Sequence, residues 1–354
     1  MELDPVLRML VEAEASDVYL VEGSPPRLRV EGITRVVDGA DPLSAQDLDA
    51  LLAEALDEGR RRQFAETREL NTAVVRPGLG RFRLNCYRAL GSVGMVLRRV
   101  REEVPSLEAL GLPPRLGDLA LERQGFVLVV GPAGSGKSTT LAALVCHRSA
   151  SRPGHIVTVE DPIEFLLPHA RSVVSQREIG IDTASYEAAL ANVLRQAPDV
   201  IFIGELREPA TVSAALHAAE TGHLVLSTLH ATNATQAVER LLHFFPAEVH
   251  QVVCLQLSLV LRAIIAQRLI PTADGAGRVP ALEIMLGTPR IQALIRRGEL
   301  EGVRAAIEEG IQDGLQSFDQ ALFALYREGK ISAEEAIQFA DSPNNLRLRI
   351  KGIR

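Results

Sequence analysis

Hydrophobic and polar positions change their period several times in the first part of the chain. Residues 3–15 carry apolar side chains at helical spacing, which predicts a first helix. Short alternating runs separated by glycine and proline follow and predict strands of a small sheet. Residues 43–62 return to helical spacing with Ser44 as the predicted N-cap, and residues 71–100 alternate again. We therefore predict one α+β domain over residues 1–100.

A second pattern begins after a short connecting segment. Residues 101–114, REEVPSLEALGLPP, are charged at their start and contain three prolines, which favours an ordered linker that can change position. Five apolar runs then alternate with helical segments: FVLVV, HIVTVE, SVVSQ, VIFIG and HLVLSTLH. This rhythm predicts a largely parallel sheet with helical crossovers over residues 115–285. We expect no β-runs beyond about Ala281, and helices over residues 286–354.

The segment FVLVVGPAGSGKSTT joins the first of these apolar runs to a helical stretch. It fits the pattern G-x-x-x-x-G-K-[ST], in which backbone N–H groups and a helix N-terminus surround phosphates. Lys137 is expected to reach the β- and γ-phosphates of ATP, and Ser138 to bind Mg²⁺. A chance glycine-rich turn is the alternative, but the strand before the motif and the helix after it favour nucleotide binding. The predicted cofactor-binding residues here are Gly131, Pro132, Ala133, Gly134, Ser135, Gly136, Lys137, Ser138 and Thr139.

Carboxylates follow two of the other predicted strands. HIVTVEDPIEF ends its apolar run at Glu160, and DVIFIGELR ends its run at Glu205. The carboxyl ends of parallel strands face the ligand crevice of such a sheet. Either glutamate is suited to hold the water shell of Mg²⁺ or to orient the attacking water, and spacing does not divide these roles. A solvated acidic turn is the alternative for Glu160.

The run TGHLVLSTLHATNA has a histidine at each end of one apolar strand, His223 before it and His230 after it. A purely structural role is the alternative for both histidines. The functional role is favoured for His230, whereas the two roles are evenly weighted for His223. We expect His230 to sense the γ-phosphate through a hydrogen bond, and His223 to belong to the cofactor-binding set. No cysteine or carboxylate at ligand spacing surrounds them, so a histidine-bound metal is not expected.

Composition narrows the class of protein. The chain has 354 residues, 47% of them hydrophobic, which suits two or more domains. Its formal net charge of -7 disfavours a surface that binds nucleic acid, so a nucleic-acid translocase is a distant alternative. Cys86, Cys146 and Cys254 form no C-x-x-C pair, which indicates a reducing compartment. With no secretory signal and no long apolar run, we expect a cytoplasmic protein whose membrane contact is peripheral.

Four motifs, GPAGSGKST, TVEDPIEF, DVIFIGELR and TGHLVLSTLH, resemble in order and spacing the secretion-ATPase superfamily that powers type IV pili and type II secretion. The resemblance covers nearly the whole chain and is strongest to the retraction ATPases of the PilT/PilU type. QREIGIDTASYEAALANVLRQAPDV and ADSPNNLRLRIK look most like the PilU side. The resemblance implies an α/β fold: a RecA-like P-loop NTPase motor domain with an N-terminal PAS-like α+β domain and C-terminal helices. It implies a Mg²⁺-dependent ATPase.

The resemblance also implies an assembly. Members form a ring of six identical subunits, in which the N-terminal domain packs against the neighbouring motor domain. Arg83 and Arg98 match the arginine pair that members send toward the triphosphate, with exposed surface charge as the alternative. The implied partner is an inner-membrane pilus platform protein, at the cytoplasmic face of the membrane at the pilus base. Hydrolysis would then drive domain rotation and pilus retraction.

One signature departs from the retraction pattern. The family's C-terminal AIRNLIREG signature aligns within Thr288–Gly298, which reads TPRIQALIRRG and has Arg297 in place of the glutamate and Gln292 among its other departures. Two alternatives therefore stay open beside autonomous retraction: an accessory ATPase subunit that assists a sister retraction ATPase, and a pilus assembly or type II secretion ATPase. Extension ATPases usually carry a further N-terminal domain and a four-cysteine zinc site, and the three cysteines here disfavour that class.

Overall fold

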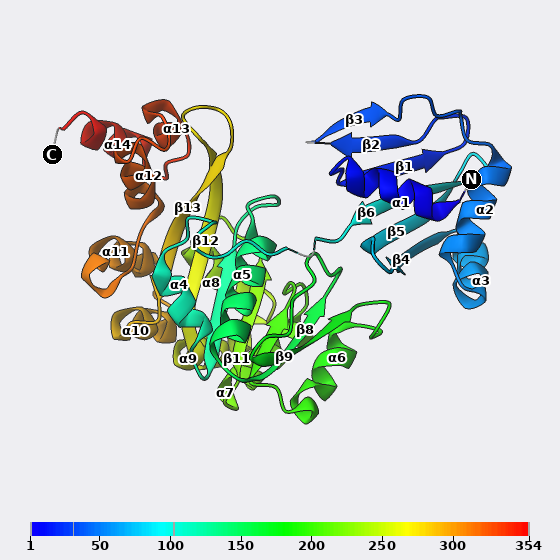
Figure 1. The fold of residues 1–354 in the computed structure, drawn as a ribbon. Coiled ribbons are helices and arrows are strands. Elements are labelled where there is room, and N and C mark those ends of the chain that lie inside the picture. Colours follow the sequence, from blue (N-terminus) through cyan, green and yellow to red (C-terminus); the bar gives the residue numbers. More distant parts are fainter. Residues whose placement is uncertain (1, 31, 102, 353–354) are drawn as a thin grey trace. The chain divides into compact units, whose positions relative to one another are not determined.

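The structure is a computed structural model that describes residues 2–30, 32–101 and 103–352 (Figure 1). The chain divides into two compact units. Unit 1 comprises Met1–Glu103, Glu164–Leu166 and Gly180–Asp182, and unit 2 comprises Val104–Ile163, Leu167–Ile179 and Thr183–Arg354. Five residues of the predicted domains and linker lie outside the described residues: Met1, Glu31, Glu102, Ile353 and Arg354.

Unit 1 is a six-stranded antiparallel sheet with three helices. Its strand order is β3-β2-β1-β6-β5-β4. Along β5 the buried side chains of Phe82, Leu84 and Cys86 alternate with more exposed ones, because successive strand residues point to opposite faces. The elements are α1 (Leu3–Glu12), β1 (Asp17–Val21), β2 (Arg27–Val30), β3 (Ile33–Val36), α2 (Ala45–Ala55), α3 (Glu58–Thr67), β4 (Glu69–Arg76), β5 (Gly80–Ala89) and β6 (Ser92–Arg99).

The helix predicted over residues 43–62 is divided into α2 and α3. Ser44 is the N-cap of α2 as predicted, since its side chain accepts a hydrogen bond from the backbone N–H of Asp47. Leu56 is extended, and the carboxylate of Asp57 then accepts from the N–H of Arg60 at 2.9 Å. Asp57 therefore caps a second helix inside a stretch whose apolar spacing indicated only one.

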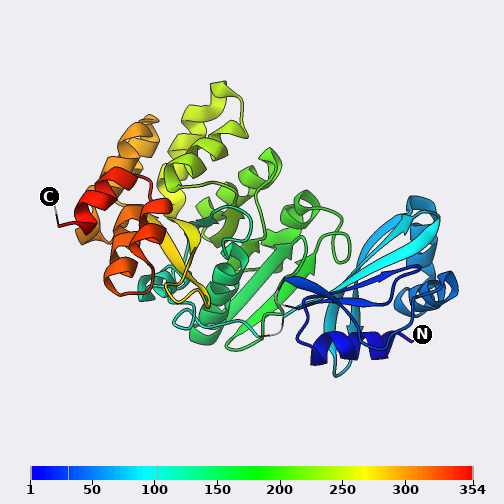
Figure 2. The same ribbon diagram turned by 90° about the horizontal axis from the view of Figure 1, so that it is seen from above.

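Unit 2 has a seven-stranded sheet in the order β13-β12-β7-β11-β10-β8-β9, parallel except for the pairing of β13 with β12. Figure 2 shows α5 on one face of the sheet and α6 to α9 toward the other. Every residue of β7 is buried, as expected for a central parallel strand covered on both faces. The elements up to β11 are α4 (Pro114–Ala120), β7 (Gly125–Val130), α5 (Lys137–Ser151), β8 (Gly154–Glu160), β9 (Ser172–Glu178), α6 (Tyr186–Val193), β10 (Val200–Ile203), α7 (Pro209–Glu220) and β11 (Leu224–Leu229).

The end of the sheet differs from the prediction. A long strand that was not among the predicted runs, β12, lies beside β7, and β13 continues past Ala281 to Leu286. The two pair antiparallel over nine register positions, so an apolar stretch without clear alternation is buried as strand. The remaining elements are α8 (Ala234–His243), α9 (His250–Val260), β12 (Leu261–Pro271), β13 (Arg278–Leu286), α10 (Pro289–Arg297), α11 (Glu301–Glu309), α12 (Phe318–Arg327), α13 (Ala333–Gln338) and α14 (Pro343–Ile350).

Helices α10 to α14 gather beside the edge of the sheet that β13 forms (Figure 1). Arg268 of β12 connects this region to the sheet. Its guanidinium donates to the carbonyl of Phe339 at 2.7 Å and to Asp341 Oδ1 at 2.7 Å, and it lies 3.8 Å from the ring centroid of Phe318. Within residues 2–30, 32–101 and 103–352, no helix has the length and apolar character needed to cross a membrane.

Candidate nucleotide-binding site

The phosphate loop lies between the carboxyl end of β7 and the amino end of α5, as predicted. Gly136 has φ +88°, a left-handed conformation that favours glycine. At Gly131 a Cβ atom would lie 2.4 Å from Ser135 Oγ and 2.6 Å from the carbonyl oxygen of Gln267, so no larger residue fits. Pro132, Ala133 and Gly134 form the exposed arc of the loop, and Ser138 and Thr139 are half-buried in the first turn of α5.

The ammonium group of Lys137 lies inside this loop. Its Nζ donates to the carbonyl oxygens of Gly131 and Pro132, each at 2.9 Å, and only 9% of the residue is exposed. Ser135 Oγ is buried and has no hydrogen-bond partner within the described part of the chain. A buried cation, an unsatisfied hydroxyl and the N-terminus of α5 fit a bound phosphate chain, because anions are stabilised by such donors.

A residue that the sequence analysis missed supports the loop from β12. The side chain of Gln267 is 3% exposed, and its Nε2 donates to the carbonyl of Ser135 at 2.8 Å. Its Oε1 accepts from Thr140 Oγ1, also at 2.8 Å. The only sequence signal was a glutamine inside the apolar run LRAIIAQRLI.

Glu160 is the last residue of β8, and Glu205 stands two positions after the carboxyl end of β10. Since β7, β8, β10 and β11 are parallel, both glutamates lie at the sheet edge that carries the phosphate loop. Glu160 is 6% exposed, and its Oε1 accepts from Thr158 Oγ1 at 2.6 Å and from Gln176 Nε2 at 3.0 Å. This buried, hydrogen-bonded carboxylate does not fit the alternative of a solvated acidic turn.

Glu205 and His230 are brought into direct contact. His230 Nε2 lies 3.0 Å from Glu205 Oε1. The other carboxylate oxygen accepts from Arg207 Nε at 2.8 Å and Nη2 at 2.7 Å. The hydrogen bond to Glu205 raises the pKa of the Arg207 guanidinium above its ordinary value. Arg207 was not among the predicted site residues, although it stands two positions after Glu205.

Arg207 also connects this carboxylate to the turn after β8. Its Nη1 lies 3.6 Å from Asp161 Oδ2. Tyr186, at the start of α6, lies in the same charged environment: burial raises the pKa of its phenol, and the negative charge of Asp161 raises it further. The ends of β8, β10 and β11 are thereby joined through side chains at one edge of the sheet.

His223 requires a correction. It precedes β11, at the amino end of the strand, where its N–H donates to the carbonyl of Ala218 and its Nδ1 lies 3.0 Å from the same oxygen. The six residues of β11, at about 3.3 Å each, put it roughly 20 Å from the edge that carries the loop and His230. Both contacts are to Ala218 near the carboxyl end of α7. The structure therefore does not bring His223 close to the phosphate loop of this unit.

Comparison with known proteins identifies the family. The model of the family described as type II/IV secretion system protein matches residues 4–325. The chain belongs to this family. It is 47% identical over 351 residues to the type IV pilus ATPase PilU of Pseudomonas aeruginosa, covering 99% of this chain and 92% of that protein. It is 39% identical over 345 residues to the type IV pilus retraction ATPase PilT of the same species, covering 98% and 100%.

Two solved structures have the same fold. The crystal structure of the pilus retraction motor PilT with bound ADP superposes with a TM-score of 0.91 at 36% identity, covering 98% of this chain and 99% of that one. The ATPase DotB of Legionella pneumophila superposes with a TM-score of 0.77 at 27% identity, covering 99% and 96%. These likenesses confirm the predicted fold class, a RecA-like α/β motor domain with an N-terminal α+β domain and C-terminal helices.

In this member of the type II/IV secretion system protein family, the predicted arginine pair lies in unit 1. Arg83 of β5 and Arg98 of β6 are register partners on adjacent antiparallel strands. Arg98 Nε donates to Asp17 Oδ1 at 2.7 Å, and 59% of the Arg98 side chain remains exposed. The structure thus places the two arginines side by side, within their own unit.

Oxygen donors near the loop suit Mg²⁺. Among the residues that the structure describes, no three His, Cys, Asp or Glu side chains form a group that could hold a metal ion. Mg²⁺ in nucleotide sites needs fewer protein ligands, because phosphate oxygens and water complete its shell. The hydroxyl of Ser138, next to the buried Lys137, and the carboxylates of Glu160 and Glu205 at the same sheet edge fit that requirement.

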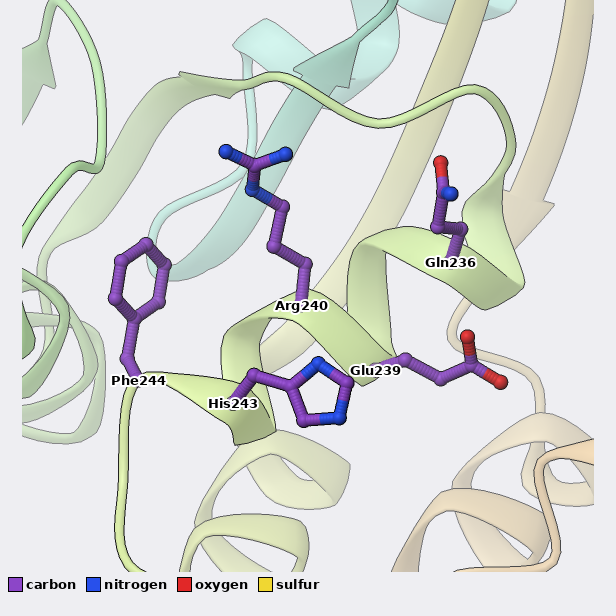
Figure 3. A pocket seen from close by; sticks show the side chains of 5 residues that line it. All are labelled: Gln236, Glu239, Arg240, His243 and Phe244. Atoms are coloured by element: carbon purple, nitrogen blue, oxygen red, sulfur yellow. The ribbon is translucent and has the colours of Figure 1, made fainter.

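A separate hollow of about 420 Å³ lies along α8 (Figure 3). The side chains that line it are spaced three to four residues apart and therefore come from one helix face and the residue that follows it. No predicted site residue lines it, and the nucleotide site does not use it. The lining residues are Gln236, Glu239, Arg240, His243 and Phe244.

Proposed function

We propose that this chain is a Mg²⁺-dependent ATPase that powers type IV pilus retraction. The observation that carries the proposal is the buried ammonium of Lys137 within a glycine loop, at the same sheet edge as the Glu205–His230 pair. Relatives named type IV pilus ATPase and type IV pilus retraction ATPase align with nearly the whole chain. A loop of this geometry is suited to a nucleoside triphosphate, and the named relatives suggest what the hydrolysis drives.

The proposed roles follow from charge and position. Lys137 exchanges its carbonyl contacts for the β- and γ-phosphates, and the loop N–H groups donate to phosphate oxygens. Ala133, Gly134 and Thr139 supply such donors, whereas Pro132, which has no N–H, shapes the loop. Bound Mg²⁺, held by Ser138, supplies positive charge that offsets charge developing on the phosphates. One of Glu205 and Glu160 would orient and polarise the attacking water, and the other would hold the water shell of Mg²⁺.

His230 is proposed to sense the γ-phosphate. Its Nε2 lies 3.0 Å from Glu205 Oε1, so a change at that carboxylate reaches the loop that follows β11. Arg207 contacts both Glu205 and Asp161 and offsets their negative charge. The contacts among Asp161, Glu205, Arg207 and His230 would therefore link the state of the bound nucleotide to the carboxyl ends of β8, β10 and β11.

We further propose that six identical chains form a ring. Arg83 and Arg98 belong to unit 1, and in the ring they would approach the triphosphate of a neighbouring subunit. Cations that reach a phosphoryl group from another subunit raise hydrolysis rates by roughly 10³ to 10⁵ in other NTPases. The proposed partners are an inner-membrane pilus platform protein and a sister retraction ATPase, with the chain cytoplasmic and peripheral to the membrane.

Steady-state ATP hydrolysis, combined with mass determination in solution with and without Mg-ATP, tests this function. We expect a hexamer that turns over and loses hydrolysis in Lys137→Ala. Lys330→Ala is a matched control, because Lys330 is exposed and pairs only with nearby Glu328 at 2.8 Å in the described residues. Undiminished hydrolysis in Lys137→Ala would refute the site. A folded wild-type protein that binds ATP without turnover would instead support the accessory subunit.

A further inference from the structure

Gln267 contacts the phosphate loop with both atoms of its side-chain amide. Nε2 donates to the carbonyl of Ser135, and Oε1 accepts from the hydroxyl of Thr140, each at 2.8 Å. The carbonyl of Ser135 can only accept, so the amide nitrogen must face it and the amide oxygen must face Thr140. The orientation of the amide is therefore fixed by its partners.

The loop backbone also passes close to Gln267. A Cβ atom at Gly136 would lie 2.7 Å from Gln267 Nε2, and one at Gly131 would lie 2.6 Å from Gln267 O. Two glycines of the motif thus allow the loop to rest directly on β12. Because the side chain is 3% exposed, solvent does not compete for either hydrogen bond while the loop is in this position.

The contact with Ser135 sets the direction of a neighbouring donor. The carbonyl of Ser135 and the N–H of Gly136 belong to one planar trans peptide, and they point in opposite directions. When Gln267 holds the carbonyl toward β12, the N–H of Gly136 is directed away from β12. A loop N–H in that direction is available to an anion.

We propose that Gln267 is a positioning residue that holds the phosphate loop in the shape that receives a nucleoside di- or triphosphate. The inference rests on the proposed function, because it assumes that this loop binds nucleotide. Gln267 acts through the peptide of Ser135 and Gly136 and through Thr140, the fourth residue of α5. Thr140 contributes to the same positioning, because its hydroxyl donates to the amide oxygen of Gln267.

Calorimetric titration of the full-length chain with ADP tests the proposal. Gln267→Met preserves length and removes both hydrogen bonds, and we expect it to weaken ADP binding by roughly tenfold or more. Thr140→Val should weaken binding by a smaller factor, whereas Thr140→Ser should bind like the wild type. The double variant Thr140→Val with Gln267→Met should bind like Gln267→Met alone, because both changes remove one shared interaction.

Gln316→Met is the matched control. Gln316 Nε2 donates to the carbonyl of Leu282 at 2.9 Å, so this change removes a similar amide hydrogen bond away from the loop. We expect a similar loss of thermal stability and an unchanged ADP affinity. A folded Gln267→Met protein with wild-type affinity, or additive losses in the double variant, would overturn the inference.

The outcomes distinguish a failure of the proposed function from a failure of the role proposed for Gln267. If the wild-type chain binds no ADP, the proposed function fails and the inference fails with it. If the wild type binds ADP and the Gln267 and Thr140 variants bind equally well, only the inference fails. If Gln267→Met does not fold, the comparison of Thr140→Val with Thr140→Ser decides, since equal affinities in that pair would overturn the proposal.

Discussion

His230 Nε2 lies 3.0 Å from Glu205 Oε1, across the ends of two adjacent parallel strands. The backbone holds this pair in place: Thr228 Oγ1 donates to the carbonyl of Gly204 at 2.6 Å, and the N–H of Leu206 donates to the carbonyl of Thr228. These bonds involve the residues on both sides of Glu205, and both run to Thr228, two positions before His230.

Replacing Glu205 by glutamine should separate hydrolysis from binding. The variant keeps the side-chain shape and loses the negative charge that polarises water, so we expect kcat to fall by about 10² to 10⁴ while ADP affinity is largely retained. Glu208→Gln makes the same change on an exposed residue three positions away and should leave kcat unchanged. Steady-state kinetics and ADP titration check this, and a fully active Glu205→Gln enzyme would contradict it.

Arg98→Ala should destabilise unit 1, whereas Arg83→Ala should not. Asp17 is 2% exposed and accepts from Arg98 at 2.7 Å, so removal of Arg98 leaves a buried carboxylate short of a cation. We expect the free energy of unfolding to fall by about 1 to 3 kcal/mol in Arg98→Ala. Urea unfolding monitored by circular dichroism measures both variants, and a further Asp17→Asn change should recover part of the loss. Equal stabilities would show that the ion pair contributes nothing.

Two glycines of the loop should respond differently to alanine. Gly134 and Gly136 both have positive φ, at +75° and +88°, so each substitution strains the backbone. A Cβ at Gly134 meets open space, whereas one at Gly136 would lie 2.7 Å from Gln267 Nε2. We expect Gly136→Ala to weaken ADP binding much more than Gly134→Ala. The ratio of the two dissociation constants is the measurement, and a ratio near one would be inconsistent with this packing.

Glu283 should make folding stability depend on pH. It is 5% exposed on β13, and its Oε1 accepts from the N–H of Ala234 at 2.6 Å. Burial raises the pKa of this carboxyl from 4.5 to about 7, despite the opposing hydrogen bond from Ala234. Because the folded pKa is raised, the stabilisation is fully present below pH 4.5 and is lost as the pH rises toward 7.

Glu283→Gln should remove that dependence. Each pH unit between the unfolded and folded pKa values corresponds to roughly 1.4 kcal/mol, so the wild type should lose about 3 kcal/mol across the interval relative to the variant. Unfolding free energies of both proteins at several values between pH 4.5 and 8 provide the test. Glu334→Gln, on an exposed position of α13, is the control. Parallel pH profiles for wild type and Glu283→Gln would exclude the effect.

Local patterns predicted the parts of the site that lie within single segments. The phosphate motif gave the loop around Lys137, and the apolar runs gave the strand ends at Glu160, Glu205 and His230. The sheet order places β12 beside β7, which joins residues more than a hundred positions apart, and no local spacing reports that neighbour. Gln267 was missed for this reason.

Two other differences have their own causes. His223 was assigned to the nucleotide because it shares a strand with His230, but strand ends face opposite edges of a parallel sheet. Arg207 is two positions after the predicted residue Glu205. The sequence did not single it out because one of its contacts, Asp161, follows a different strand. Local sequence patterns therefore predict which residues belong to a helix or strand. Which residues they contact depends on the order of the strands in the sheet, which those patterns do not report.

Gln267 and Arg268 are consecutive in β12, and adjacent strand residues project to opposite faces. One side chain contacts Ser135 and Thr140 at the phosphate loop, and the next contacts Phe339 and Asp341 near the carboxyl end of the chain. Their Cα atoms stay about 3.8 Å apart whatever the strand does. If β12 shifts, the contacts of Gln267 with the phosphate loop and of Arg268 with the C-terminal region must therefore shift together. This strand couples the position of the loop to that of the C-terminal helices.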